Sequence, residues 1–324
     1  MSASPKSAES QFKSGLIYGL IAYTVWGAVP LYFSQVFLEF AAIGKPDHDL
    51  LEILAHRIGW SMPLMVIVTL LTPGGARNLW GVLRSPKLVG ILLLSATFLS
   101  GNWLLYIFAT ETKRIAEAAL GYFMLPLVNA LLATVFLREK LRPLHYPALA
   151  IIALGVLVLP MIVYGEFLWI SVALPLSFGA YGLIRKMIPV DGGTGLTVET
   201  MLLVLPCLGY IAYRGWIGEG AFGVNFSISF WLLLGGFMTV VPLLTYTLSI
   251  RRLPLLTQSF IQFISPLVQL LIAVFAFGQE VDWVRWVALS CVLIAVCLFV
   301  TDAVLLAKRR RRALEAIPES VGAR

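Results

Sequence analysis

Long apolar runs, separated by short clusters of charged residues, Gly and Pro, dominate the pattern along the chain. A membrane-spanning helix needs roughly 20 apolar residues. A spanning strand needs only about 9–11 residues of alternating polarity, and that alternation is absent. The pattern therefore predicts an all-α integral membrane protein of about ten transmembrane helices. Their expected ranges are 16–38, 52–71, 88–109, 115–137, 143–163, 166–185, 195–214, 228–249, 254–278 and 282–307.

One boundary between expected helices carries little charge. From Pro143 to Ile184 the only Asp, Glu, Lys or Arg is Glu166. A single helix of this length would extend about 63 Å, which is twice the thickness of the hydrocarbon core. The chain must therefore reverse, and Gly165–Glu166 is the expected position.

Composition narrows the class of protein. Of 324 residues, 59% are apolar and 13% charged, against about 45–50% and about 25% in soluble domains. This excludes a soluble enzyme or a nucleic-acid-binding module. The three cysteines lie in apolar runs without metal-like spacing, so we expect no metal and no cofactor.

The distribution of Lys and Arg predicts the orientation in the membrane. Alternate loops and the two ends carry 18 of these residues on the side of the N-terminus and 5 on the other side. By the positive-inside rule, both termini are expected in the cytoplasm of a bacterial inner membrane protein. The basic run Lys308–Arg312 directly follows a span, which favours an anchor against anionic lipid over a nucleic-acid contact.

The two halves of the chain resemble each other. A shift of 140 residues superposes the third and fourth expected helices on the eighth and ninth, and Pro126-Leu-Val meets Pro266-Leu-Val. Two five-helix repeats must insert with opposite orientation, an architecture of secondary transporters with substrate at the midplane. The predicted parts are a tail at 1–15, repeats at 16–163 and 166–307, and a basic cytoplasmic tail at 308–324.

The matched prolines are candidate helix breaks. Proline has no N–H, so Pro126 would free the carbonyl of Tyr122, and Pro266 that of Gln262. Such a carbonyl is tolerated at membrane depth inside the bundle or beside a water-filled cavity. An ordinary kink repaired by neighbouring helices explains the prolines equally well.

The second expected helix holds the main ionisable group, Glu52-x-x-x-His56-Arg57-x-x-Trp60. Arg57 can grip a carboxylate or phosphate, and His56 can carry a coupling proton. Trp60 lies four residues after His56, on the same helix face. Arg57 is also close enough to the helix end to extend to the lipid headgroups, so both interpretations stay open.

Other polar and aromatic residues are weaker candidates for a substrate site. The polar ones can hold substrate or join helices, and the aromatic ones can line a pocket or pack. They are Asn102, Glu117, Gln258, Gln262, Tyr106, Tyr122 and Tyr246. No nucleotide loop and no nucleophile beside a base is present, so we expect no catalytic residue and no enzyme.

Several motifs resemble the RarD family, which belongs to the EamA branch of the drug/metabolite transporter superfamily. The motifs are His56-Arg57-x-x-Trp60-Ser61, Gly101-Asn102-Trp103, Glu117-Ala-Ala-Leu-Gly121-Tyr122 and Gln262-Phe263-Ile264-x-Pro266. The resemblance covers residues 13–308. It implies ten helices, two EamA-type repeats and a bacterial inner-membrane permease, and it favours a functional role for His56 and Arg57.

The sequence thus favours a secondary transporter that moves a small organic solute, such as a metabolite, an amino acid or a drug-like compound, outward. Its partners would be this solute, the lipid bilayer and, as a coupling ion, the proton. An integral-membrane enzyme and an uncoupled channel-like facilitator are the alternatives.

The orientation can be measured with topology reporters. We expect fusions at both termini, after Lys140 and after Arg252 to report the cytoplasm, because 18 of the basic loop residues lie on that side. A fusion after Lys113 serves as the control and should report the opposite side. A periplasmic signal at either terminus would contradict the ten-helix prediction.

Overall fold

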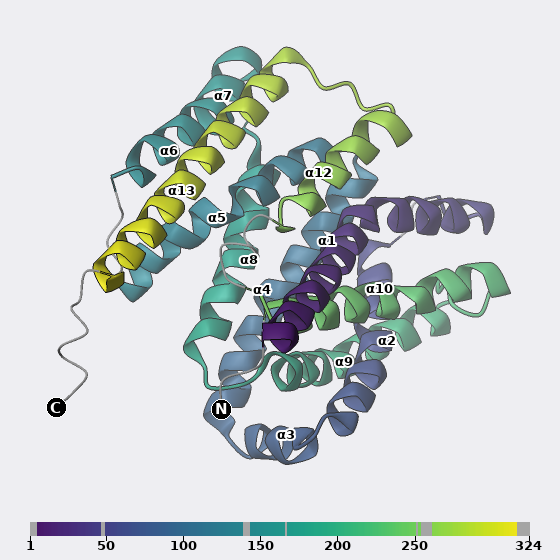
Figure 1. The fold of residues 1–324 in the computed structure, drawn as a ribbon. Helices are drawn as coiled ribbons and strands as arrows, with labels where there is room; N and C mark the ends of the chain where they lie inside the picture. Colours follow the sequence, from purple (N-terminus) through teal and green to yellow (C-terminus); the bar gives the residue numbers. More distant parts are fainter. Residues whose placement is uncertain are drawn as a thin grey trace. The chain divides into compact units, whose positions relative to one another are not determined.

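The computed structural model describes residues 5–46, 49–138, 143–165, 167–250, 252–253 and 261–315, and their regular structure is helical throughout (Figure 1). The α-helices and two π-helical stretches, η1 and η2, are α1 (Pro5–Ala42), α2 (Leu50–Leu71), α3 (Gly75–Leu83), α4 (Pro86–Glu111), α5 (Ile115–Leu137), α6 (His145–Ile152), η1 (Ala153–Val158), α7 (Leu159–Tyr164), α8 (Trp169–Met187), α9 (Gly192–Trp216), α10 (Phe226–Ile250), α12 (Ile264–Leu271), η2 (Ile272–Ala276) and α13 (Trp283–Glu315).

The helices are those of a multi-pass membrane protein. Within the described residues, 7 helices are long and apolar enough to cross a bilayer, and two shorter apolar helices accompany them. Large apolar side chains such as Leu71, Leu205 and Phe275 are at least 76% exposed. A surface of this kind suits lipid and would be a liability in water. The all-α membrane fold is confirmed, and the number of ten spans stays a prediction.

Local signals in the sequence explain several helix ends. The carboxylate of Asp49 accepts a hydrogen bond from the N–H of Leu51 (2.8 Å) at the start of α2. Asp191 does the same for Thr194 (2.9 Å) at the start of α9, so both act as N-caps. Gly165 follows α7 with φ of +68°, the left-handed conformation that glycine adopts most readily. The predicted helix end at this glycine is confirmed, and the reversal of the chain stays a prediction.

Helix α3 was not among the expected elements, because its segment looked like a charged loop. Leu79 and Val82 of α3 are buried in a small apolar cluster with Leu92, Ile188 and Val198. This packing stabilises a nine-residue helix that would be marginal in isolation.

The region of Pro266 differs from the expectation. A continuous helix over 254–278 would place Pro266 at mid-span, but α12 begins at Ile264. Pro266 therefore lies in the first helical turn, where N–H groups lack intrahelical partners and a proline costs little. Gln262 lies in the turn that precedes α12, and Gln258 lies outside the described residues.

The other matched proline has a different backbone context. Helix α5 is helical on both sides of Pro126. The two prolines are thus not equivalent, and the role of Pro126 beside a cavity stays a prediction.

The chain forms two compact units. Unit 1 comprises Met1–Tyr122 and Trp169–Val281, and unit 2 comprises Phe123–Leu168 and Asp282–Arg324. Within unit 1, α1 packs on α10 and α12, α2 on α9 and α10, and α4 on α8 and α9. Within unit 2, α6 and η1 pack on α13. Each unit draws on both halves of the chain, so this division differs from the predicted repeats.

The packing within unit 1 supports the predicted duplication. If α8, α9 and α10 are the second-half equivalents of α1, α2 and α4, each helix contact should have an equivalent contact. The α1–α10 contact then corresponds to α8–α4, the α2–α10 contact corresponds to α9–α4, and the α2–α9 contact corresponds to itself. All of these contacts are present. In addition, Pro86 and Phe226, which begin α4 and α10, are 140 positions apart. The repeats remain a prediction with this support.

Gly236 allows α10 to approach α2 closely. A Cβ atom at this position would lie 2.7 Å from the backbone carbon of Trp60. Small residues at helix contacts are a common means of packing in membranes. The backbone of α2 at Trp60 can therefore approach α10 because Gly236 has no side chain.

This contact predicts the effect of a methyl group on stability. Gly236→Ala should destabilise the purified protein by about 1–3 kcal/mol, because overpacking forces the two backbones apart. Gly209→Ala in α9 is the control, since its added Cβ would meet nothing within 4 Å. Thermal unfolding in detergent measures both variants. Equal unfolding temperatures would contradict the close contact.

Candidate functional site

His56 and Arg57 of α2 point into different surroundings. Consecutive residues on an α-helix are about 100° apart around its axis. Arg57 contacts α10 and α4, whereas His56 stacks against Phe222 in the segment before α10. The structure therefore does not bring these two candidates together as a pair.

Arg57 points into the interior of unit 1. Its side chain is 5% exposed, and its Nε donates a hydrogen bond to the Oγ1 of Thr239 on α10 at 2.6 Å. The Thr239 hydroxyl donates in turn to the carbonyl oxygen of Gly235 at 3.1 Å. This orientation differs from the extension to the lipid headgroups that the sequence left open.

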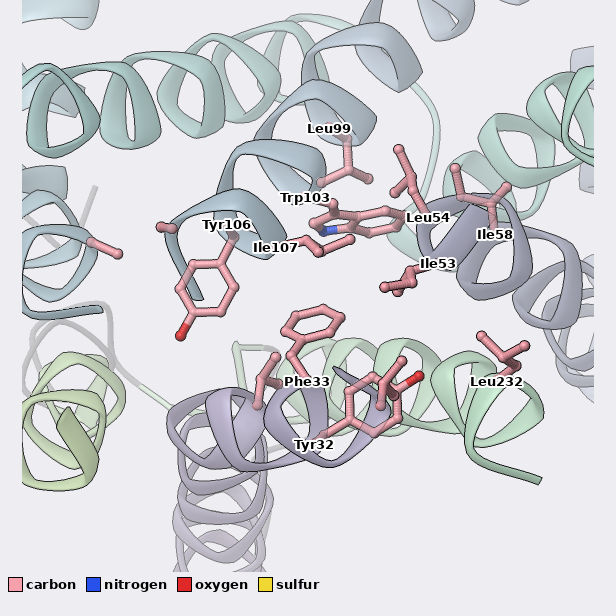
Figure 2. Close-up of a cluster of buried hydrophobic side chains, with 14 of the residues drawn as sticks. Tyr32, Phe33, Ile53, Leu54, Ile58, Leu99, Trp103, Tyr106, Ile107 and Leu232 are labelled. Atoms are coloured by element: carbon pink, nitrogen blue, oxygen red, sulfur yellow. The ribbon is translucent and has the colours of Figure 1, made fainter. Parts of the chain in front are cut away.

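Aromatic rings surround the Arg57 guanidinium. Its Cζ lies 4.5 Å from the centre of the Trp103 ring and 5.8 Å from that of Phe33, distances typical of cation–π contacts. The Tyr106 ring lies 6.3 Å from that of Phe33 and 5.8 Å from that of Tyr122, centre to centre. Figure 2 shows Trp103 and Tyr106 of α4 facing Phe33 of α1.

Several hydrogen-bond donors at this position lack acceptors. Among the described residues, no carboxylate lies within ion-pair distance of Arg57, and the one hydrogen bond of its guanidinium is that of Nε to Thr239, which leaves Nη1 and Nη2 available. The buried hydroxyl of Tyr106 also has none. We call the group formed by Arg57 with Phe33, Trp103, Tyr106, Tyr122 and Thr239 the arginine site.

Asn102 contacts the arginine site through Tyr122 and joins it to α8. Its Nδ2 donates to the carbonyl oxygen of Leu174 (2.9 Å) and to the Oγ of Ser177 (2.9 Å), both on α8. Its Oδ1 accepts a hydrogen bond from the hydroxyl of Tyr122 at 3.3 Å. Asn102 thus joins α4 to α8 and orients Tyr122.

His56 forms a separate polar group with Glu52 and Trp60. The Nε1 of Trp60 donates to the Nδ1 of His56 at 3.2 Å. The Nε2 of His56 has no hydrogen-bond partner and lies 3.9 Å from the Oε1 of Glu52. Because Nδ1 accepts, the neutral imidazole carries its hydrogen on Nε2, which faces the carboxylate.

Glu52 also joins α2 to the α9–α10 connection, a link that the sequence pattern did not predict. Its Oε1 accepts a hydrogen bond from the N–H of Ala221 at 2.6 Å. Its Oε2 lies 3.6 Å from the Nε of Arg214, and Arg214 pairs with Glu219 at 2.6 Å. This network fixes the end of α2 that carries His56.

Glu117 has protein partners that join α5 to α8. Its Oε1 accepts a hydrogen bond from the N–H of Ile170 (2.9 Å) in the first turn of α8, and its Oε2 pairs with the Nη2 of Arg114 at 2.6 Å. Both carboxylate oxygens therefore have protein partners. This arrangement supports the helix-joining interpretation of Glu117 over substrate binding.

Tyr246 and Gln262 lie outside the arginine site. The Tyr246 ring packs against Tyr23 and Trp26 of α1, with ring centres 6.1 and 5.5 Å away. Gln262 is half-buried in the turn before α12. Tyr246 therefore belongs to a second aromatic cluster of unit 1.

A buried ion pair elsewhere in unit 1 was missed by the sequence analysis. Glu199 of α9 is 1% exposed, accepts a hydrogen bond from the Oγ of Ser95 at 2.7 Å, and lies 3.8 Å from the Nη1 of Arg185. Glu199 and Arg185 stand near the ends of their expected spans, where charges are ordinarily solvated. The hydropathy pattern therefore gave no signal that these two side chains meet in the interior.

These features define a class of protein. Helices suited to a bilayer enclose charged and aromatic side chains in their interior, an arrangement that marks substrate or ion pathways. Within the described residues, no group of three or more His, Cys, Asp or Glu side chains is arranged to hold a metal ion. The fold and site are those of a membrane transport protein.

Comparisons with known proteins identify the family. Residues 13–161 match the model of the EamA-like transporter family. The chain is 36% identical to "Protein RarD" of Streptomyces exfoliatus over 97% of its own length and 96% of that protein. It is 33% identical to an "Uncharacterized transporter" of Vibrio cholerae serotype O1, covering 93% of this chain and 96% of that protein.

The fold has also been solved before. A structure described only as "Crystal structure of protein" aligns with a TM-score of 0.53 at 21% identity, covering 92% of this chain and 98% of that one. The chain belongs to the RarD proteins of the EamA-like transporter family. It is a membrane transporter of the drug/metabolite superfamily.

The role of Glu117 can be measured through stability. Glu117→Ala should lower the free energy of unfolding by about 1–3 kcal/mol, because the first N–H groups of α8 and the Arg114 guanidinium lose their acceptor. Glu219→Ala is the control, since this carboxylate forms an equally short pair but is 60% exposed; surface pairs contribute about 0–1 kcal/mol. Equal losses in both variants would contradict a helix-joining role.

Proposed function

We propose that this protein is a secondary transporter that moves small organic solutes, such as metabolites, amino acids or drug-like compounds, outward across the bacterial inner membrane. The observation that carries the proposal is the arginine site, a buried guanidinium without a described anionic partner, inside a membrane bundle of a transporter family. A bundle that needed only stability would avoid this desolvated charge. A transporter uses such a group to replace the hydration shell of its solute.

We further propose that protons are the coupling ion, and that Glu52 and His56 form the proton-binding group. Their facing atoms lie 3.9 Å apart, and neither the Nε2 of His56 nor the Oε2 of Glu52 has a hydrogen-bond partner. A proton added at the Nδ1 of His56 displaces the hydrogen bond from Trp60 and makes the imidazole cationic, so that the Nε2–H that faces Glu52 becomes a charge-assisted donor. Arg214 adjoins Glu52, so protonation of the pair also changes the network at the end of α2.

The division into two inverted five-helix repeats belongs to the same proposal. It is supported by the exchange symmetry of the helix packing in unit 1 and by the 140-residue separation of α4 and α10. Both termini are expected in the cytoplasm on the basis of the charge distribution.

Flux in proteoliposomes tests the transport function. Purified protein should exchange solutes from a metabolite panel faster than protein-free liposomes do, and an imposed pH gradient should drive net movement. Arg57→Lys should reduce flux at least tenfold with normal insertion, because an ammonium lacks the planar fork of donors. Arg84→Lys is the matched control, since Arg84 also lies over a Trp ring, at 4.9 Å, but is exposed.

His56→Gln tests the coupling separately. Glutamine can still accept the hydrogen bond of Trp60 but does not titrate near neutral pH. We expect solute exchange to persist while its dependence on pH flattens. If the solute flux of the unmodified protein is the same with and without a pH gradient, the result would instead favour an uncoupled facilitator.

A further inference from the structure

The charge balance of the arginine site points to the chemical class of its ligand. Arg57 carries one permanent positive charge, and no described carboxylate lies within ion-pair distance of it. A buried charge without a partner is strongly unfavourable in a bilayer-embedded core. Its Nε is engaged with Thr239, so Nη1 and Nη2 are the two donors that remain.

The geometry of these donors selects the anionic group. The two terminal nitrogens of a guanidinium form parallel hydrogen bonds to the two oxygens of one carboxylate. The Tyr106 hydroxyl, which is buried and has no acceptor, can supply a further donor. A carboxylate accepts all three and balances the single positive charge. A phosphate monoester carries about −1.5 to −2 at pH 7 and would leave excess negative charge buried.

The surrounding residues select the remainder of the ligand. The rings of Phe33 and Trp103 lie against the guanidinium, and Tyr106 and Tyr122 pack together with ring centres 5.8 Å apart. Such walls favour an apolar, preferably aromatic, body. An ammonium group is disfavoured, because Arg57 would repel it and the Oδ1 of Asn102 already accepts from Tyr122.

We propose that the arginine site binds aromatic monocarboxylates without an amino group next to the carboxylate. In this arrangement Nη1 and Nη2 of Arg57 hold the two carboxylate oxygens, and Tyr106 donates a third hydrogen bond. The inference rests on the proposed function for its meaning in transport. It excludes free amino acids from the solutes considered there.

Binding to the purified full-length protein in detergent tests this directly. The probes are 3-phenylpropionate, its amide, phenylalanine and phenyl phosphate, which share one ring and differ in charge. Isothermal titration should give saturable binding of 3-phenylpropionate, and at least tenfold weaker binding of the other three. Benzoate and indole-3-acetate extend the series of carboxylates. Equal affinity for the amide or for phenylalanine, tighter binding of phenyl phosphate, or no binding of any carboxylate would overturn the proposal.

Single substitutions test whether 3-phenylpropionate binds at the arginine site. Arg57→Gln should weaken 3-phenylpropionate binding at least tenfold, and Arg84→Gln, the exposed counterpart over a Trp ring, should leave it unchanged. Tyr106→Phe removes only the unpartnered hydroxyl and should weaken binding about three- to tenfold at an unchanged unfolding temperature. This variant and Arg57→Lys decide the matter if Arg57→Gln does not fold. Unaltered affinity in Tyr106→Phe and Arg57→Lys would place the ligand elsewhere.

The binding measurement separates this inference from the transport proposal, because detergent-solubilised protein needs no membrane gradient. Selective carboxylate binding without flux in proteoliposomes would refute the transporter and leave the inference intact. Flux of neutral or zwitterionic solutes, with no preference for carboxylates, would support the transporter and refute the inference.

Discussion

The buried guanidinium of Arg57 constrains the centre of unit 1. A charge in a medium of low dielectric must be hydrogen-bonded and surrounded by polarisable groups, or it destabilises the fold. The structure meets this demand with residues from three other helices: Thr239 of α10, Trp103 of α4 and Phe33 of α1. The packing of these helices is therefore constrained by the charge. The Nη1 and Nη2 donors of Arg57 remain available to an anion that enters the site.

Helix α2 is linked to the second half of the chain by polar side chains near each of its ends as well as at the arginine site. Near its start, Glu52 bonds to the segment before α10 and adjoins Arg214 of α9. Near its last turn, Thr69 shares a 2.7 Å hydrogen bond with Thr197 of α9. Every polar link of α2 to the second half of the chain thus runs to α9, α10 or their connection among the described residues. A movement of α2 against α9 and α10 would change the arginine site and both ends together.

The polar residues of the bundle divide into two kinds. Asn102 and Glu117 have protein partners for their donors and acceptors, and they join helices that are distant in the sequence. Arg57, Tyr106 and His56 retain atoms without partners. Satisfied groups stabilise a single packing, whereas unsatisfied buried groups are costly and are retained where a ligand or proton completes them. In this chain the groups with partners therefore join helices, and the groups without partners are the candidates for contact with a ligand or proton.

The sequence by itself determined the membrane class, the approximate ranges of the long apolar helices, the helix end at Gly165 and the presence of an ionisable group in α2. Length and hydropathy suffice for these, because the bilayer fixes the dimensions. Only the tertiary structure decided that Arg57 meets Thr239, 182 positions away, that His56 and Arg57 separate, and that Glu117 bonds to α8. The spans are apolar on all sides, so their pattern does not distinguish the lipid-facing side from the interior. Which polar groups meet depends on helix packing, and that is decided by contacts between residues far apart in the chain.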